Sequence, residues 1–244
     1  MDSPPPATEP SGAGAERTVG QAVQLRGLSR YFGERAALRE LDASVPVGAT
    51  LAVLGRNGAG KSTLLRILAT LLRPHRGRVT LLGEPLPARA WAVRGRVGFL
   101  AHEPLLYRDL SGRENLRYHA ALHGVGRERI EEVLVAVRMQ RRADEPVRLL
   151  SRGMVQRLAV ARAVLHRPEL LLLDEPRSNL DPAAEELIEP LIGRASATTR
   201  VLTSHDPRAA LAEADLVLAL RDGRRAYFGE PAGLDERALR ELYR

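Results

Sequence analysis

A glycine-rich stretch at residues 55–63 restricts the possible folds of this chain more than any other feature. It reads Gly-Arg-Asn-Gly-Ala-Gly-Lys-Ser-Thr and matches the phosphate-binding pattern G-x-x-x-x-G-K-[ST] at every fixed position. The apolar run 50–54 before it suits a buried parallel strand, and the run 64–68 after it suits a helix with an apolar face. This order of strand, loop and helix is the context that the pattern requires, which argues against a chance glycine-rich turn. The stretch predicts a nucleotide-binding site.

Each position of the stretch has an expected role in holding phosphate. Glycines at 55, 58 and 60 let backbone N–H groups turn toward an anion at the positive end of the following helix. Lys61 is expected to hold the β- and γ-phosphates and Ser62 to bind magnesium. Lys and Arg total 37 and Lys61 is the only lysine, so the one compact ammonium stands where phosphate binding needs it. The predicted nucleotide-binding residues of the loop are Gly55, Arg56, Asn57, Gly58, Ala59, Gly60, Lys61, Ser62 and Thr63.

Composition limits the class of protein. A chain of 244 residues, 44% of them hydrophobic, has room for one large domain or two small ones. A net charge of +7 would suit nucleic acid, but the arginines are scattered and aromatic residues make up only 4%, so we do not expect nucleic-acid binding as the main role. The chain has no cysteine, no apolar run long enough to span a membrane and no signal-peptide core. We therefore expect a soluble, intracellular protein.

The pattern along the chain predicts alternating strands and helices. Residues 1–20, rich in Pro, Ala, Gly and Ser, indicate a disordered tail. Short apolar stretches between residues 22 and 45 predict two or three strands around a turn at Gly33. Further strands are expected at 78–82, 96–100, 169–173 and 200–204, with a hairpin around 222–223 and a terminal helix at 235–243.

Helical features gather between residues 105 and 165. Ser111 and Glu114 form a capping box that predicts a helix to about His123. A second helix is expected at 128–137 and a third from Ser151, so the region predicts an inserted helical subdomain. His119 and His123 stand one helical turn apart, which leaves zinc binding open. Because no third ligand is in view, a solvated helix face is the preferred interpretation.

Two carboxylates follow the apolar strand at 169–173. In an open parallel sheet, ligands bind at the carboxyl edge, where Asp174 and Glu175 would stand. We expect Asp174 to bind magnesium and Glu175 to polarise the attacking water, the alternative being an acidic strand end that faces solvent. His205 ends the strand 200–204 and is expected to reach a γ-phosphate, although a loop histidine without that role also fits.

Two other places admit two interpretations each. Ser151 suits the N-cap of a helix, and together with Gly153 it also leaves backbone amides bare at a helix start, which is a second anion site. The adjacent aromatics Tyr31 and Phe32 are either core residues or a platform on which a flat base stacks.

In this order, the residues resemble the nucleotide-binding subunit of an ABC transporter over about 21–230. The resemblance implies an α/β P-loop NTPase fold of the ABC type across 21–244, with a mixed sheet core, an N-terminal antiparallel β subdomain and the helical subdomain at about 105–165. It implies ATP and Mg²⁺ as cofactors and ATP hydrolysis as the activity. The implied roles are adenine stacking for Phe32, Walker A for 55–63, the signature for 150–154, Walker B for 170–174, catalytic glutamate for Glu175, the D-loop for 178–181 including Asp181, and the switch histidine for His205.

The resemblance also implies partners. Two copies would hold ATP between them head to tail, so that Ser151 and Gly153 of one reach the γ-phosphate bound by the other. Transmembrane permease subunits would hold the pair at the cytoplasmic side of the cell membrane.

Two positions depart from the family pattern. His102 stands where a glutamine is usual, and one of its nitrogens is expected to serve magnesium directly or through a water. The signature reads Leu150-Ser151-Arg152-Gly153-Met154 in place of Leu-Ser-Gly-Gly-Gln. It retains the serine and the second glycine, so recognition of the γ-phosphate is expected to survive.

The finer assignment concerns the transported molecule. Ala101-His102, the apolar 105–107, Glu-Asn-Leu at 114–116 and the signature at 150–154 resemble the ATP-binding subunit of the haem exporter of cytochrome c maturation. The alternatives are an exporter of drugs, lipid or polysaccharide, a soluble ABC ATPase that acts on DNA or ribosomes, and a small-molecule kinase. The soluble ABC ATPase usually needs two nucleotide domains or a long coiled coil, and the small-molecule kinase leaves the signature and His205 unexplained.

Overall fold

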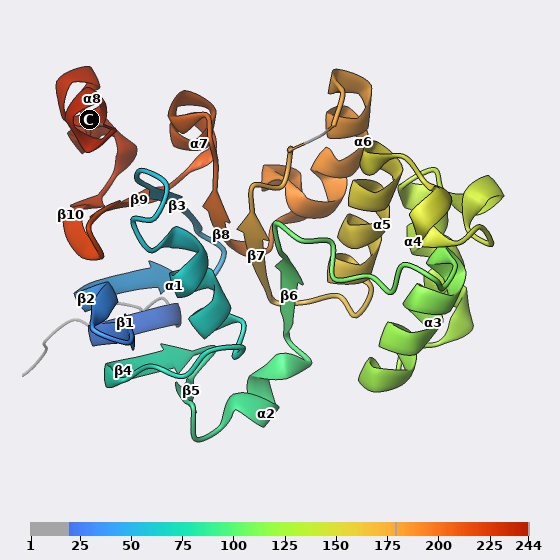
Figure 1. Cartoon of the computed structure of the whole chain (residues 1–244), viewed down its shortest axis with the longest axis horizontal. Helices are drawn as coiled ribbons and strands as arrows, with labels where there is room; N and C mark the ends of the chain where they lie inside the picture. The colour runs from blue at the N-terminus through green and yellow to red at the C-terminus, as the bar shows by residue number, and fades with distance from the viewer. Residues whose placement is uncertain (1–19, 179, 244) are drawn as a thin grey trace, which may run out of the picture.

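The computed structural model describes residues 20–178 and 180–243. The predicted disordered tail at 1–20 lies outside the described residues except for Gly20, and so does Asn179 of the predicted D-loop. Among the described residues, two sheets and the helices around them form the fold (Figure 1).

The first sheet is antiparallel and has the strand order β2-β1-β4-β5. β1 (Gln21–Phe32) and β2 (Arg35–Pro46) form the hairpin predicted around Gly33, whose φ of 56° is left-handed. β4 (Arg76–Leu81) confirms the strand expected near 78–82, and β5 (Glu84–Leu86) is an addition that the sequence did not indicate. The N-terminal antiparallel sheet is thereby confirmed.

The second sheet has six strands and carries the strand before the phosphate-binding loop near its middle. Its strands, in spatial order, are β10 (Arg224–Gly229), β9 (Leu216–Arg221), β3 (Thr50–Leu54), β8 (Thr199–Thr203), β7 (Leu170–Asp174) and β6 (Val97–Leu100). The strands from β9 to β6 are parallel, and β10 runs antiparallel to β9. The sheet is therefore mixed, as predicted. Asp222 and Gly223 join β9 to β10 with φ angles of 50° and 76°, as a tight hairpin requires.

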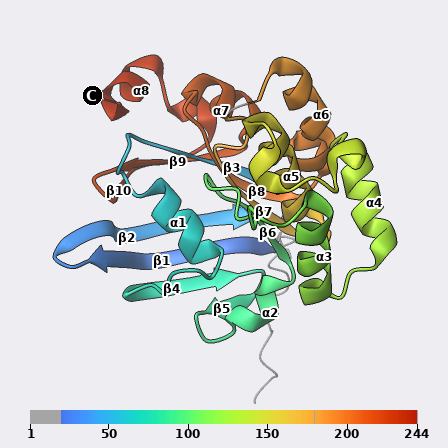
Figure 2. The same cartoon turned by 45° about the vertical axis from the view of Figure 1, so that its right-hand side comes forward.

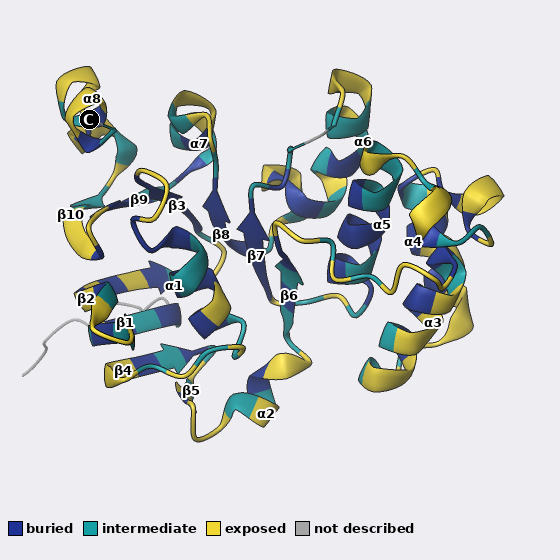
Figure 3. Ribbon diagram, in the orientation of Figure 1, coloured by how far each residue is buried: buried dark blue, intermediate teal, exposed yellow. Residues whose placement is uncertain are grey.

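The parallel strands are buried on both faces. In β3, Leu51 and Val53 pack in the core shared with the first sheet, and Ala52 and Leu54 pack in the core on the opposite face. α1 (Lys61–Leu68) fills the first core, so the phosphate-binding loop is held between two packed elements. Figure 3 shows the dark blue, buried strands between helices whose outer sides are exposed.

Helices α3 (Gly112–His123), α4 (Arg127–Ala136) and α5 (Arg152–Val164) lie to the right of β7 and β6 in Figure 1, and Figure 2 shows α5 nearer to the strands than α3 and α4. The predicted capping box is present, because Ser111 accepts from the Glu114 N–H and the Glu114 side chain accepts from the Ser111 N–H. These helices share one continuous core with the sheet, so their division into a subdomain stays a prediction.

The remaining helices are α2 (Ala90–Arg94), α6 (Pro182–Ile192), α7 (Pro207–Glu213) and α8 (Glu236–Leu242). α8 is the terminal helix predicted at 235–243, and α6 begins at Pro182, a residue that favours the first turn of a helix, whereas the sequence pattern did not indicate α2 or α7. Over residues 20–178 and 180–243, no helix combines the length and the apolar character needed to cross a bilayer.

Candidate active site

Four neighbouring parallel strands deliver the predicted site residues to one sheet edge. The phosphate-binding loop follows β3, His205 follows β8, Glu175 follows β7 and His102 follows β6. Their carboxyl ends surround an open cleft of about 660 Å³. The residues that line it are Phe32, Arg35, Ala37, Asn57, Gly58, Gly60, Lys61, Ser62, Thr63, Arg66, His102, Asp174, Glu175 and His205. Residues spread over most of the chain therefore meet in one place.

The loop at 55–63 has the backbone geometry that its glycines predict. Gly55, Gly58 and Gly60 have φ angles of 142°, 82° and 110°. A Cβ at Gly60 would stand 2.6 Å from the Ala37 carbonyl oxygen, so any side chain there would push the loop from β2. Only glycine allows this close approach of the loop to β2.

Lys61 lies on the floor of the cleft and is only 8% exposed. Its Nζ donates to the Gly55 carbonyl at 2.6 Å and to the Arg56 carbonyl at 3.2 Å. Burial lowers the pKa of Lys61, and the nearby carboxylates of Glu175 and Asp174 oppose that shift. The ammonium is thus partly desolvated, a state in which an incoming phosphate oxygen gains more from it than in open water.

Thr203 organises the two carboxyl positions at the end of β7. Its hydroxyl donates to Asp174 Oδ1 at 2.7 Å and accepts the Glu175 N–H at 3.1 Å. Asp174 and Thr203 are both buried. Sequence reasoning did not single out Thr203, although a polar residue at the end of a buried strand, two positions before His205, was a usable signal.

Glu175 stands between the two histidines of the edge. Its Oε2 lies 2.7 Å from His205 Nε2 and 3.4 Å from His102 Nδ1. The Glu175 side chain is 13% exposed, whereas His102 and His205 are 65% and 63% exposed. The φ of Glu175 is 58°, which is a left-handed conformation. This conformation is energetically unfavourable for residues other than glycine, and it is often found in strained turns at functional sites. The carboxylate is held where a water at the cleft would meet it.

The adjacent aromatic residues Tyr31 and Phe32 have different surroundings in the structure. Phe32 lines the cleft, is 49% exposed and has the Arg30 guanidinium 4.9 Å from its ring centre. Tyr31 instead stacks on His75 with ring centres 5.9 Å apart. The geometry makes Phe32 the available ring for a base, and its stacking role stays a prediction. Arg35 and Arg66, which sequence reasoning missed, add positive charge to the cleft.

Gly55, Arg56 and Ala59 of the loop do not line this cleft, and neither do three predicted nucleotide-binding residues from outside the loop. Ser151 caps α5 by accepting the Met154 N–H, with Gly153 in the first turn, and Asp181 caps α6 by accepting the Ala184 N–H. None of the three lines the cleft formed by the phosphate-binding loop. Within one copy of the chain they do not join the site, so their predicted role depends on a second copy.

In the structure, a third histidine, His166, lies beside the two that were considered for zinc binding. His166 stacks on His123 with ring centres 4.1 Å apart and planes at 6°. Parallel rings direct their nitrogens side by side instead of toward one point. Within the described part of the chain, no three side chains of His, Asp or Glu are arranged to hold a metal ion. The expected solvated helix face is wrong, because His119 and His123 are both partly buried and burial lowers the pKa of each.

The donors at the cleft suit magnesium with a nucleotide. Ser62 and Asp174 supply oxygen ligands, which Mg²⁺ prefers, and Mg²⁺ usually takes only one or two protein ligands beside waters and phosphate oxygens. His102 fits less well, because its Nδ1 is a nitrogen donor near Glu175. Ser62 and Asp174 are the residues that would hold the ion.

The comparisons with known proteins agree with this geometry. Residues 38–178 match the ABC transporter family. The chain is 38% identical over 221 residues to the Nod factor export ATP-binding protein I of Bradyrhizobium diazoefficiens, covering 87% of this chain and 72% of that protein. It is also 38% identical to the phosphonates import ATP-binding protein of Anaeromyxobacter dehalogenans, covering 95% of this chain and 50% of that protein.

A solved structure has the same fold. The dimeric ATP-binding cassette MJ0796, in a post-hydrolysis state bound to ADP and Pi, superposes with a TM-score of 0.76 at 26% identity, covering 86% of this chain and 98% of that one. With the family match across most of the phosphate-binding and helical regions, this chain belongs to the ABC transporter family as an ATP-binding, ATP-hydrolysing subunit.

Proposed function

We propose that this chain drives export across a membrane by hydrolysing ATP in the cleft between β3, β8, β7 and β6. The observation that carries the proposal is the convergence of Lys61, Asp174, Glu175 and His205 at one sheet edge. Lys61 neutralises charge on the β- and γ-phosphates, and Ser62 with Asp174 would hold magnesium, which would polarise the phosphate oxygens. Glu175 accepts the proton of the attacking water. His205, in contact with that carboxylate, orients it and faces the γ-phosphate.

The complete site requires a second copy of the chain in this proposal. Ser151 and Gly153 stand at an exposed helix start, away from their own cleft. A second copy placed head to tail would bring this positive helix end to the γ-phosphate. The dimeric state of the MJ0796 cassette supports the arrangement. A Ser151→Arg variant tests it, because ATP should bind normally and remain uncleaved. Normal hydrolysis by that variant would contradict the shared site.

The membrane partner has a candidate docking groove next to the cleft. The groove measures about 740 Å³ and has apolar residues of the 104–106 loop, Val147, Leu150 and Val155 on its walls, with Arg108 and Arg152 beside them. His102 lines both this groove and the cleft. Because His102 also lies 3.4 Å from Glu175, movement of a docked segment would reach the catalytic carboxylate through it. We propose that permease subunits dock here and hold the chain at the cytoplasmic side of the cell membrane.

A His102→Gln variant separates docking from chemistry. Either side chain can hold a water near magnesium, so ATPase activity of the chain alone should stay within a few-fold. Transport with the cognate membrane subunits should fall more, because the loop shape is matched to them. Equal losses in both assays would contradict a role in coupling.

We propose haem as the transported molecule. The proposal rests on the resemblance of three segments to the haem exporter subunit, namely 101–107, 114–116 and 150–154. A deletion strain tests this proposal directly. Covalent c-type cytochromes should be depleted while other haem proteins persist, and the wild-type gene should restore them. The Bradyrhizobium relative favours a second candidate, the ATPase of another exporter. Normal c-type cytochromes with a defect in drug resistance, lipid or surface polysaccharide would select that candidate.

A further inference from the structure

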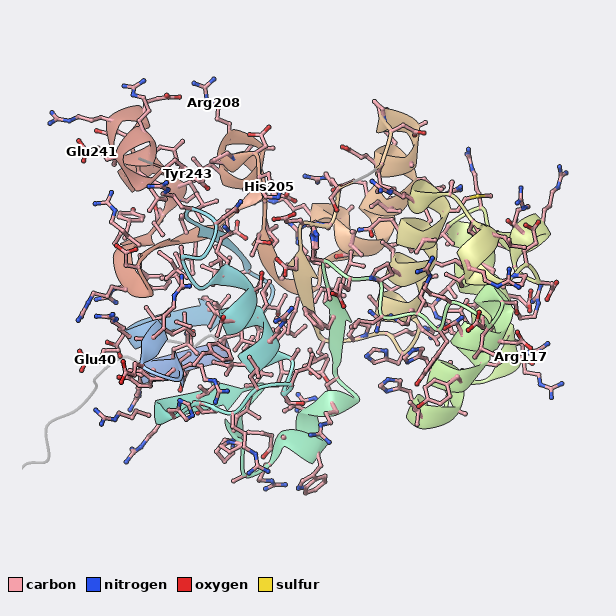
Figure 4. All side chains as sticks on the ribbon, in the orientation of Figure 1. Glu40, Arg117, His205, Arg208, Glu241 and Tyr243 are labelled. Atoms are coloured by element: carbon pink, nitrogen blue, oxygen red, sulfur yellow. The ribbon has the colours of Figure 1, made fainter. Side chains whose placement is uncertain are left out.

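The last described helix, α8, contacts the phosphate-binding loop. The hydroxyl of Tyr243, the residue after α8, accepts the backbone N–H of Gly55 at 3.3 Å. Gly55 and Tyr243 are 188 residues apart in the sequence. Figures 1 and 4 show α8 and the labelled Tyr243 beside the loop between β3 and α1.

Both backbone polar groups of Gly55 are hydrogen-bonded. Its N–H donates to Tyr243, and its carbonyl accepts from Lys61 Nζ at 2.6 Å. A Cβ at Gly55 would lie 2.3 Å from the Leu220 carbonyl oxygen of β9, so the backbone has little room to move on that side. The Tyr243 hydroxyl therefore acts on the residue whose carbonyl positions the Lys61 ammonium.

Apolar burial, rather than surface charge, anchors α8. Leu239 and Leu242 are 9% and 3% exposed and belong to the core beside the sheet, and the Tyr243 ring packs against the same core. The Arg221 guanidinium adds a hydrogen bond to the Glu241 carbonyl at 2.5 Å. The ion pair between Arg208 of α7 and Glu236 is exposed and contributes little. A helix held in this way presents the tyrosine hydroxyl from a fixed place.

The hydroxyl is neutral in this position. Burial raises the pKa of the Tyr243 phenol, and the hydrogen bond from Gly55 opposes the shift only in part. A neutral phenol oxygen accepts the amide hydrogen without placing negative charge beside the phosphates.

We propose that Tyr243 is a positioning residue for ATP binding, which fixes the Gly55 peptide and through it the resting place of Lys61. The inference rests on the proposed role of the 55–63 loop in holding phosphate. Tyr243 touches neither Glu175 nor Asp174 in the described hydrogen bonds, so it should affect the affinity for ATP and not the rate of the chemical step.

A pair of tyrosine variants tests this proposal. Tyr243→Phe removes one hydroxyl and keeps the packed ring, so the chain should fold. Tyr227→Phe is the matched control, because Tyr227 packs against the same core and its hydroxyl donates to the Glu230 carbonyl at 2.7 Å, away from the loop. For each variant, the Kd of a fluorescent ATP analogue, the KM and kcat of ATP hydrolysis, and the thermal midpoint should be measured.

The expected result is a split between the two variants. Tyr243→Phe should raise Kd and KM roughly two- to tenfold, as expected for one lost hydrogen bond, with kcat within twofold of wild type. Tyr227→Phe should leave all three constants unchanged at a similar thermal midpoint. Unchanged Kd in Tyr243→Phe, or equal changes in both variants, would overturn the proposal. Binding of the analogue by the wild type and loss of this binding in Lys61→Ala test the phosphate site itself. If the wild type did not bind the analogue, or Lys61→Ala bound it normally, the proposed phosphate site would be wrong, whatever the result for Tyr243→Phe.

Discussion

His205 Nε2 lies 2.7 Å from Glu175 Oε2, and this contact joins the ends of two neighbouring parallel strands. Glu175 is the less exposed member, and its backbone N–H is held by Thr203 of the same strand that carries the histidine. Glu175 is therefore held at its backbone by Thr203 of β8 and at its side-chain oxygen by His205, two residues beyond Thr203. A displacement of β8 or of its following loop would move Glu175, the proposed base.

Glu175→Gln tests the base directly. The amide keeps the size of the side chain but cannot take the proton of water, so hydrolysis should fall by at least about 10²-fold while ATP binding persists. ATP should then convert the variant to a stable dimer, detected by light scattering. Glu169→Gln, at the other end of β7 and paired with Arg96, is the control and should hydrolyse ATP normally. A monomeric Glu175→Gln variant at saturating ATP would argue against the shared site.

Lys61→Ala should remove most ATP binding. A charge-assisted contact contributes about 1.5–3 kcal/mol, which corresponds to a loss of roughly tenfold to a hundredfold in affinity measured by calorimetry. Arg78→Ala removes an exposed cation of β4 and should leave the affinity unchanged. Wild-type affinity in Lys61→Ala would refute the loop assignment.

Phe32→Ala should weaken the binding of all purine nucleotides to a similar extent. Stacking on an aromatic ring contributes roughly 1–3 kcal/mol and does not depend on the hydrogen-bonding groups of the base. Tyr31→Ala serves as the comparison, since its ring stacks on His75 instead of lining the cleft. Binding of ATP, GTP and ITP should be measured for both variants. A larger effect from Tyr31→Ala would assign the base to the other ring.

Thr203→Val should impair the response to magnesium. The valine is similar in shape but leaves Asp174 Oδ1 without its buried donor and the Glu175 N–H without its acceptor. We expect kcat to fall at least about fivefold and half-maximal activity to need more Mg²⁺, because an unpaired buried group costs about 1–3 kcal/mol. Thr199→Val, which removes the acceptor of the Gly48 N–H at the start of the same strand, should lower stability alone. An identical Mg²⁺ dependence in both variants would exclude a positioning role for Thr203.

The cluster formed by His119 and His123 of α3 and by His166, which follows α5, should make the fold sensitive to acid. Burial lowers the pKa values of His119 and His166 to about 4, with smaller contributions from Arg162 and His123. The unfolded chain binds these protons near pH 6.5, so between about pH 6.5 and 4 it holds more protons than the native state. Stability should therefore be complete above pH 6.5 and decrease as the pH falls toward 4.

Urea unfolding at pH 7.5 and pH 5.0 measures this effect. His119→Gln should lose less stability between the two pH values than the wild type, because its side chain cannot take up the proton. His75→Gln removes a histidine that lies just before β4, away from the cluster, and is the control. An equal pH dependence in wild type and His119→Gln would show that the cluster does not govern acid sensitivity.

Features that depend on near neighbours in the chain were predictable from the sequence. The glycines of the 55–63 loop, the Ser111 and Glu114 capping box, and the hairpin turn at 222–223 all have the predicted geometry. Asp174, Glu175 and His205 were also placed correctly at one edge, because parallel strands bring their carboxyl ends together. The elements that were missed, β5, α2 and α7, are three, five and seven residues long. Such lengths are too short for a reliable apolar period.

Contacts between distant segments were decided only by the tertiary structure. From spacing alone, the sequence predicted a phosphate-binding loop, a carboxylate pair at one strand end and a histidine at the end of another strand. It contained no signal that Tyr243 would reach Gly55, or that His166 would stack on His123. Thr203 acquired its role from the pairing of β7 with β8, which aligns its hydroxyl with Asp174. These contacts depend on how helices and strands pack in three dimensions, and the burial of apolar faces that drives such packing is non-directional, so local sequence patterns do not specify them.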